Sequence, residues 1–478
     1  MKKSIKRNYV YNLVYQILVL ITPLITTPYL SRVLGADGVG TLSFTESVVS
    51  YFTLFATFGM TTYGQREISY VQDSKDNRSN VFYETKILEF ISTAIAVAVY
   101  LPFALCQNNS ILYLIYGLNL LSVLANVTWF FQGMEEFGRI VARNIIFKLV
   151  NIAYIFAFVR QKDDLAIYAF GMAFFLLLSN LSLWVYLPKF IGAPNFKTIR
   201  PFRHILVIIT LFIPTIAGQI YTVMDKTMIG IITKDSFENG YYEQASKISK
   251  MVLTIVTSLG TVMIPRIGYH FGRGETDKVN LYMYKAYRFV WFVGIPLSFG
   301  LVGVASNFVP WFFGNGYEKV IPLLSILGFL VIAIGLNNIT GIQYLIPTKR
   351  QNLFTLTVFI GAGVNLLMNA ILISRYQSIG AAIASVTAES AIALTQFWFI
   401  RKDISIFKVF QSSRNYLFSG FAMLLVIKIL GKQFLPSIFN TFLLVAIGGL
   451  LYLVLLILIK DSFLIENTSR IINKIKNH

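Results

Sequence analysis

Long apolar runs recur along the whole chain, and they constrain its fold more than any other feature. Each is about 20 residues long, the length that an α-helix needs to cross about 30 Å of hydrocarbon. Such unbroken runs do not match the short alternating strands of a transmembrane barrel. The sequence therefore predicts an all-α integral membrane protein with about 14 transmembrane helices, at 9–31, 41–62, 87–106, 111–131, 140–159, 165–187, 205–232, 241–265, 287–309, 320–346, 353–373, 380–399, 415–430 and 439–459.

Composition argues against a large soluble domain and against catalysis. Hydrophobic residues make up 56% of the chain and charged residues 13%, which is typical of multi-span membrane proteins. Cys106 is the single cysteine, so an intrachain disulfide and a cysteine metal cluster are excluded. The three histidines all fall outside the predicted spans, and no phosphate-binding GxxxxGK[ST] segment occurs. We expect no cofactor, no bound metal and no enzymatic activity.

Basic residues are distributed unevenly between the two sides of the membrane. With the loops assigned alternately, the side of the N-terminus collects 30 of the 41 lysines and arginines, and the opposite side holds seven. Cytoplasmic loops carry such an excess of positive charge, so both termini are predicted to be cytoplasmic in a bacterial inner membrane. The net charge of +19 is thereby explained by topology, and we expect no nucleic-acid partner. The first apolar run follows MKKSIKRN without a cleavage site and is expected to remain as a span.

The seventh and eighth spans carry charged residues at bilayer depth. Asp225 and Lys226 lie near the end of the seventh, and Glu243, Lys247 and Lys250 lie in the eighth after a polar turn. An unpaired charge at mid-bilayer costs about 2.5–3.5 kcal/mol, so these side chains must face protein or water. The residues of the eighth span are spaced i, i+4, i+7 and share one helical stripe, where Glu243 can pair with Lys247.

This charged hairpin allows two interpretations. In the first, its carboxylates and cations neutralise one another in a static network. In the second, its three cations outnumber its two anions and the excess positive charge binds an anion. Buried ion pairs rarely improve on apolar packing, which favours the second interpretation. Arg32, near the outer end of the first span, is a further candidate cation. Four carboxylates within spans are candidates for ion coupling or, alternatively, for structural pairs: Asp225, Glu46, Glu243 and Glu389.

The two halves of the sequence resemble each other. RVLGADGVGTLSFTE, which ends at Glu46, resembles the segment that follows Lys226, with a basic residue, a glycine, a polar turn, a second glycine and a new helix. A second match has an offset of 211 residues and pairs Gln132 with Gln343 and Arg139 with Arg350.

This duplication predicts the domain organisation. Six helices per half is an even number, so both halves keep the same orientation about an axis along the membrane normal. We expect an N-terminal lobe at 1–200, a C-terminal lobe at 201–410, and two additional helices with a cytoplasmic tail at 411–478. Pro23 and Pro28 are expected to interrupt the first helix.

The segment MDKTMIG…ENGYYEQASKISK…VMIPRI, followed by GRGETDKVNLYMYKAYR, resembles the middle of bacterial polysaccharide flippases. These are the O-antigen and capsule repeat-unit translocases of the multidrug/oligosaccharidyl-lipid/polysaccharide exporter superfamily. YLSRVLGADGVGTLSF and YQSIGAAIASVTAE resemble the first and last repeat elements of that family, so the resemblance covers essentially the whole chain. It implies a V of two six-helix lobes around a central cavity. It also implies that undecaprenyl-diphosphate-linked oligosaccharide moves from the inner to the outer leaflet by alternating access, without covalent chemistry.

The resemblance also implies which partners and site residues to expect. A diphosphate requires cations in a low-dielectric cavity, and the candidates are Lys247, Lys250, Lys226 and Arg32. The expected partners are the lipid-linked oligosaccharide, membrane lipids, a polysaccharide polymerase and a chain-length regulator. A lipid II flippase and a multidrug or cation antiporter of the same superfamily are the alternatives. The lysines of the eighth span argue against the antiporter, which needs acidic residues for cationic drugs.

Overall fold

The computed structural model describes residues 5–258 and 260–466. Every regular element in these two ranges is a helix. The chain divides into two compact units, Met1–Gly230 and Ile231–His478. The predicted division into 1–200, 201–410 and 411–478 stays a prediction.

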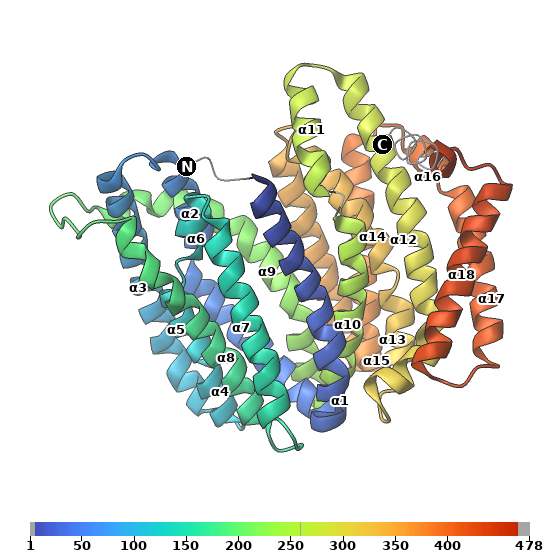
Figure 1. The fold of residues 1–478 in the computed structure, drawn as a ribbon, viewed down its shortest axis with the longest axis horizontal. Coiled ribbons are helices and arrows are strands. Elements are labelled where there is room, and N and C mark those ends of the chain that lie inside the picture. Colours follow the sequence, from blue (N-terminus) through green and yellow to red (C-terminus); the bar gives the residue numbers. More distant parts are fainter. Residues whose placement is uncertain (1–4, 259, 467–478) are drawn as a thin grey trace. The chain divides into compact units, whose positions relative to one another are not determined.

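The first unit is built from helices that run up and down between short loops (Figure 1). Its elements are α1 (Ile5–Thr57), α2 (Met60–Tyr70), α3 (Lys75–Leu105), α4 (Ser110–Tyr116), α5 (Leu118–Ala125), α6 (Thr128–Gly133), α7 (Phe137–Phe158), α8 (Leu165–Ser182), the 3-10 helices η1 (Leu183–Lys189) and η2 (Pro201–His204), and α9 (Ile205–Thr233).

Helix α1 contains two predicted spans joined at a glycine. The helix continues through Pro23 and Pro28, and its non-helical residue is Gly35, with φ 71° and ψ 173°. The expectation that the prolines interrupt this helix was wrong, because membrane helices tolerate proline where neighbouring groups satisfy the freed carbonyl. Gly35 adopts a backbone conformation that a Cβ disfavours, so it can end one span and begin the next.

Helices α2 and α6 approach each other closely through glycine. A Cβ added to Gly64 would lie 2.5 Å from the ring of Trp129, and one added to Gly133 would lie 2.8 Å from the carbonyl oxygen of Gln65. Trp129 is fully buried and stacks on Phe82 with ring centroids 5.7 Å apart. Small residues at such crossings allow the close backbone packing that associates helices in a membrane.

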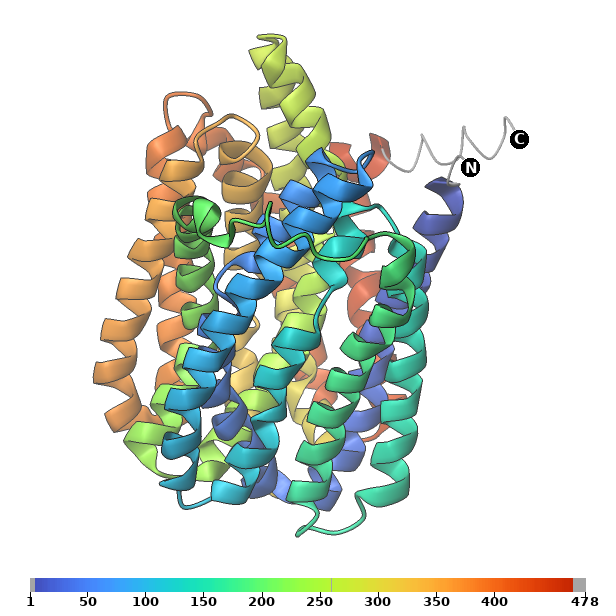
Figure 2. The ribbon, with the colours of Figure 1, turned by 90° about the vertical axis from the view of Figure 1, so that its left-hand side faces the viewer.

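The linker at 190–200, which leads from α8 and η1 towards α9, lies against the first turns of α3 (Figure 2). Glu84 of α3 is fully buried and accepts hydrogen bonds from the backbone N–H of Arg200 and from the guanidinium of Arg203, both at 2.8 Å. His204 Nε2 lies 2.8 Å from the same carboxylate. A buried charge requires such partners, so Glu84 fixes the start of α9 to α3.

The second unit has the same up-and-down organisation. Its elements are α10 (Ser236–Thr257), α11 (Gly260–Gly272), α12 (Thr276–Phe313), α13 (Val320–Leu327), α14 (Leu330–Asn337), the π-helix η3 (Asn338–Leu345), α15 (Gln351–Ile400), α16 (Ile406–Gln411), α17 (Arg414–Gly431) and α18 (Ile438–Leu458).

Helix α12 packs against α13, α14, α17 and α18, and Figure 1 shows α17 and α18 beside it. Two glycines permit the close packing of α12 against α17, and a third permits that of α17 against α18. A Cβ would lie 2.8 Å from Ile427 at Gly303, 2.5 Å from Ile295 at Gly420, and 2.5 Å from Ile427 at Gly448. The last two predicted helices therefore pack directly on the core of this unit.

Helix α15 contains two antiparallel spans joined by a sharp bend. Gln377 is the non-helical residue, with φ 55° and ψ −131°. After the bend, Gly380 lies so close to the first half that a Cβ there would be 2.3 Å from the carbonyl oxygen of Leu372. Glycine is therefore required at this position.

A buried carboxylate stabilises the bend from a neighbouring helix. Glu238 in the first turn of α10 accepts hydrogen bonds from the backbone N–H of Ser378 at 3.1 Å and from its hydroxyl at 2.6 Å. Lys319, immediately before α13, donates to Glu238 at 2.5 Å and to the side-chain oxygen of Gln377 at 2.6 Å. Glu238 thus joins α10, α13 and both halves of α15.

The predicted fold class is confirmed. Among the described residues, ten helical segments are long and apolar enough to cross a membrane. Two of these contain the bends of α1 and α15 and so hold two spans each, while α9 and α10 are long helices that carry charges. Together they are consistent with about 14 spans. The predicted span at 111–131 is a stack of three short helices, α4 to α6.

Candidate functional site

Helix α10 presents the charged stripe that its spacing predicted. The Nζ of Lys247 lies 3.2 Å from the Oε1 of Glu243, with 39% of the lysine side chain and 12% of the glutamate side chain exposed. Lys250, about one turn further along, is exposed. Glu238 lies on the opposite face and is buried, and Asn239, one turn before Glu243 on the same stripe, is buried as well. The stripe therefore holds one ion pair and a second ammonium, that of Lys250, about one turn further along.

Asp225 and Lys226 lie on α9, in the part that clusters with the first unit. Asp225 is buried and Lys226 is half-buried. Thr227, the next residue, donates a hydrogen bond from its hydroxyl to that of Ser47 on α1 at 3.0 Å. This end of α9 is therefore attached to the second half of α1. The expected meeting of the polar stripes of α9 and α10 joins residues of both compact units and stays a prediction.

Arg32 and Glu46 lie on α1 on opposite sides of the bend at Gly35. Both are exposed. Arg32 donates a hydrogen bond to the carbonyl oxygen of Pro28 at 3.2 Å, one turn earlier in the helix. Glu46 lines a polar cavity in the first unit. The bend places these two candidates on different helical segments.

That cavity has a volume of about 280 Å³ and lies among α1, α5 and α8. Besides Glu46, its polar lining consists of Ser50, Thr53, Asn119, Ser122, Asn126 and Asn180. One carboxylate surrounded by hydroxyl and amide groups offers hard oxygen ligands, which suit a proton, a water cluster or a small cation.

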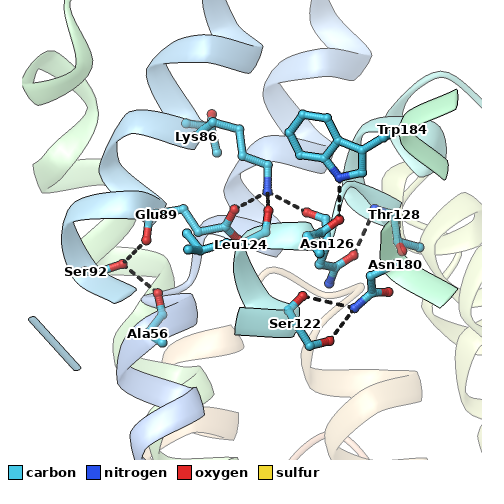
Figure 3. Close-up of polar contacts among 12 residues, drawn as sticks. Ala56, Lys86, Glu89, Ser92, Ser122, Leu124, Asn126, Thr128, Asn180 and Trp184 are labelled. Atoms are coloured by element: carbon cyan, nitrogen blue, oxygen red, sulfur yellow. Dashed lines mark hydrogen bonds and ion pairs between the residues drawn. The ribbon is translucent and has the colours of Figure 1, made fainter. Parts of the chain in front are cut away.

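A hydrogen-bonded network borders this cavity where α5 ends (Figure 3). Lys86 forms an ion pair with Glu89 and donates to the carbonyl oxygens of Leu124 at 2.9 Å and Asn126 at 2.8 Å. The last carbonyls of a helix lack intrahelical partners, and a buried ammonium satisfies them here. Glu89, 1% exposed, has its charge compensated by Lys86.

Asn180 of α8 and Trp184 of η1 are hydrogen-bonded to the C-terminal end of α5 (Figure 3). The Nδ2 of Asn180 donates to the hydroxyl of Ser122 at 2.8 Å, and the indole N–H of Trp184 donates to the carbonyl oxygen of Ala125 at 2.7 Å. Asn126 begins α6 by accepting from the backbone N–H of Thr128 at 2.9 Å. The cavity wall is therefore rigid along α5 and α8.

In the second unit, Glu389 of α15 lies in a buried polar seam against α14. The Nδ2 of Asn337 donates to the Glu389 carboxylate and, at 3.0 Å, to its backbone oxygen. Gln396 donates to Thr357 at 3.3 Å, which sets the antiparallel register of the two halves. Asn365 in the first half of α15 and Glu389 in the second are both buried.

Several oxygens in this unit are buried acceptors. The Oδ1 of Asn337, the Oε1 of Gln343 and the Oε1 of Gln396 accept no hydrogen bond from the described part of the chain. Tyr242 on α10 contacts Ser385 on α15, hydroxyl to hydroxyl, at 3.0 Å. A buried carboxylate such as that of Glu389 can hold a proton. Among the described residues, no three His, Cys, Asp or Glu side chains are grouped closely enough to hold a metal ion.

The structure thus brings together Glu243 and Lys247, with Lys250 on the same stripe of α10. The sequence predicted Glu46 and Glu389 as candidate residues, but it did not predict the polar side chains that lie near them. Sequence reasoning missed Asn119, Asn180 and Asn365. The available signal was the occurrence of asparagine within otherwise apolar spans, where an amide is costly unless it is hydrogen-bonded.

Comparison with known proteins identifies the relatives of this fold. A family model described as "Polysaccharide biosynthesis protein" matches residues 5–270. The chain is 26% identical over 410 residues to a putative O-antigen transporter of Escherichia coli (strain K12), covering 84% of this chain and 98% of that protein. It is 20% identical over 385 residues, or 79% of each chain, to the probable low-salt glycan biosynthesis flippase Agl15 of Haloferax volcanii.

Solved structures with the same fold are membrane transporters. The structure of a lipid II flippase, MurJ, in an inward closed conformation matches with a TM-score of 0.73 at 17% identity, over 94% of this chain and 99% of that one. An inward-facing multidrug resistance transporter of the MATE family and MOP superfamily matches with a TM-score of 0.61 at 14% identity, over 83% and 99% of the two chains. At these identities the likeness establishes the fold alone.

Proposed function

The chain belongs to the polysaccharide biosynthesis protein family, and we propose that it is a flippase for lipid-linked oligosaccharide. Its cargo is the undecaprenyl-diphosphate-linked repeat unit, which it moves from the inner to the outer leaflet of the bacterial cytoplasmic membrane by alternating access. Both chain termini lie in the cytoplasm. A polysaccharide polymerase and a chain-length regulator receive the product. The names of the similar O-antigen transporters and of the glycan flippase support this cargo class.

The observation that carries the proposal is the pair of lysines on α10. The Nζ of Lys247 lies 3.2 Å from the carboxylate of Glu243 with 39% of the lysine side chain exposed, and Lys250 on the same stripe is exposed. An ammonium at bilayer depth is retained only where it meets protein, water or an anionic ligand. A diphosphate forms strong charge-assisted hydrogen bonds with such groups. Lys226 and Arg32 are proposed as further contacts to the diphosphate.

Replacement of both lysines, Lys247→Gln with Lys250→Gln, tests this assignment. Loss of the two ammonium groups should abolish surface polysaccharide and should slow flipping of a fluorescent lipid-linked oligosaccharide in proteoliposomes by at least about tenfold, since charge-assisted bonds to phosphate each contribute about 1.5–3 kcal/mol. The protein level in the membrane should be unchanged.

The matched control is Lys402→Gln, an exposed lysine in the loop that follows α15, which should transport at the parental rate. Normal flipping by the double variant, with normal protein level, would remove the two lysines from the cargo site. Lipid II tested in the same liposomes distinguishes the nearest alternative, because a lipid II flippase would move it at least as fast as the repeat unit. Efflux of a cationic drug would favour the antiporter.

We further propose that carboxylates in the polar sites couple transport to an ion gradient. Glu46 lines the first-unit cavity together with hydroxyl and amide groups, and Glu389 in the second-unit seam accepts a hydrogen bond from the Nδ2 of Asn337. Asp225 and Glu243 are the other two candidates. A carboxylate in such a setting can exchange a proton or a small cation between two conformations.

Flipping assayed in proteoliposomes with and without an imposed proton or sodium gradient tests the coupling. Flipping should accelerate when the gradient is imposed. The variant Glu389→Gln should lose that acceleration and should keep the parental rate measured without a gradient. The same rate in parental protein with no gradient and with either gradient would rule coupling out. Asp164→Asn, which changes a loop carboxylate between α7 and α8, serves as the control.

A further inference from the structure

An apolar groove of about 380 Å³ lies between α3 and the segment that leads out of α8. Phe82, Trp184, Leu187, Ile191 and Ala193 are among the residues that line it. The Trp184 ring is held in place by its hydrogen bond to Ala125. The groove is separate from the polar cavity of the same unit, with which it shares none of its lining residues.

Basic residues surround this groove. Lys75 is exposed, and its Cε lies 4.0 Å from where a Cβ would be placed on Gly192, a lining residue. Lys189 is exposed and lies within the lining segment. The Arg78 guanidinium donates to the carbonyl oxygen of Phe190 at 3.1 Å. The positive charge therefore lies at the same end of the unit as the groove.

The segment that leads out of α8 carries no acidic residue, whereas on the α3 side the exposed Asp73 and Asp76 lie close in sequence to Lys75. From residue 165 to residue 224 there is no aspartate or glutamate, although four basic residues occur there: Lys189, Lys197, Arg200 and Arg203. Arg203 is engaged by Glu84. The two lysines remain as exposed positive charge. Such a basic rim complements an anion, and the apolar floor complements a hydrocarbon chain.

We propose that this groove binds an anionic phospholipid of the surrounding bilayer. One acyl chain lies along Phe82, Trp184 and Leu187, and the phosphate lies beside Lys75 and Lys189. Tryptophan at a membrane–water boundary and basic pockets between helices are the two features that recognise such lipids. The occupant is a resident lipid, so this inference does not depend on which cargo the protein moves.

Lipid binding to the full-length protein in detergent tests the proposal. Native mass spectrometry with dioleoyl phosphatidylglycerol, and with dioleoyl phosphatidylethanolamine for comparison, should show a tighter site for the anionic lipid. The variant Lys75→Gln with Lys189→Gln should bind phosphatidylglycerol roughly twentyfold more weakly, since each cation near a lipid headgroup contributes about fivefold. Phosphatidylethanolamine binding should change little.

A second variant tests the groove without altering charge. Ala193→Trp should fill the groove and displace the acyl chain, which also lowers the affinity for phosphatidylglycerol. Its matched control is Val185→Trp, on the same segment but 76% exposed and outside the lining, which should bind like the parental protein. Unchanged monodispersity and thermal stability confirm that each variant is folded.

Three outcomes would overturn the proposal. Equal affinity for the two phospholipids would mean that the headgroup charge is not recognised. Parental binding by Ala193→Trp would mean that the lipid lies elsewhere. Displacement of phosphatidylglycerol by an equimolar amount of undecaprenyl diphosphate would assign the groove to the cargo lipid and not to a resident phospholipid.

Discussion

The charged residues of this protein differ in burial, and the buried carboxylates at helix junctions have a structural role. Glu84, Glu89 and Glu238 are at most 4% exposed, and each is bound by a cation. Burying a charge without partners is costly, so these residues hold helices together. Lys250, in contrast, is exposed at the end of the charged stripe of α10. The charges that the fold does not need to bury are the ones proposed to meet the cargo.

Replacement of Glu238 should destabilise the second unit. Glu238→Gln leaves the Lys319 ammonium with a weaker partner and removes an acceptor from Ser378. Breaking a buried pair costs about 3 kcal/mol, so the thermal unfolding midpoint of the purified protein should fall. Glu318→Gln, at an exposed glutamate beside Lys319, should leave it unchanged. Equal midpoints for the two variants would contradict the structural role of Glu238.

A pH effect is expected at the turn between α11 and α12. Hydrogen bonds from His270 and Lys278 hold the pKa of the Glu275 carboxyl below its ordinary value. Because folding lowers the pKa of Glu275, its ionised carboxylate stabilises the turn. This stabilisation is fully present above the unfolded-state pKa of about 4.3 and is lost as the pH falls through the folded-state pKa. Amide protection at 271–276, corrected for intrinsic exchange, should be constant from about pH 8 to about pH 5 and should decrease below about pH 4.

The variant Glu275→Gln provides the comparison for this effect. It has no carboxyl to titrate, so its protection at 271–276 should be lower at neutral pH and should not depend on pH in the same range. A decrease of the same size in the variant would assign the pH response to another group.

Single helices in this protein bend where glycine or a left-handed residue allows it. Gly35 divides α1, and Gln377 divides α15 with Glu238 as its support. Pro23 and Pro28 remain inside a continuous helix. Proline removes one hydrogen bond, whereas a turn between two membrane spans requires a change of backbone direction. For this reason the two bends coincide with positive φ and not with proline.

Two glycines of α15 should respond oppositely to alanine. Gly380→Ala places a Cβ 2.3 Å from the Leu372 carbonyl oxygen and should lower stability by about 1–3 kcal/mol, because the backbone must move. Gly363→Ala meets no heavy atom within 4 Å and should be neutral or stabilise the helix by up to about 1 kcal/mol. Thermal unfolding of both variants in detergent measures the difference, and a destabilisation of equal size would contradict the close packing at the bend.

For the protein as a whole, the proposed topology puts the basic loops in the cytoplasm. Cys106, the single cysteine, is exposed in the loop after α3 and is assigned to the outer side. A membrane-impermeant maleimide added to spheroplasts should therefore label the parental protein without permeabilisation. Labelling that appears only after permeabilisation would invert the topology.

A relocated cysteine completes this test. In a variant with Cys106→Ser and Lys402→Cys, the thiol lies in the exposed loop after α15, on the basic side. This variant should react only after the membrane is permeabilised. Reaction in intact spheroplasts would contradict the cytoplasmic assignment of that loop.

The sequence by itself determined that this is an all-α membrane protein with about 14 spans, because each span must be apolar over the thickness of the bilayer. It also predicted the Glu243–Lys247 pair, because positions four apart on a helix are neighbours whatever else the chain does. Its resemblance to polysaccharide flippases agrees with the family match over 5–270.

Only the tertiary structure decided which polar groups from distant segments meet. Lys86 lies at the end of α5, Asn337 binds Glu389, and Glu238 supports the bend of α15. These contacts join residues 38 to 140 positions apart, and no local periodicity encodes which partners share a helix crossing. Because the packing of whole helices sets those distances, the polar cavity and the lipid groove emerged only with the fold.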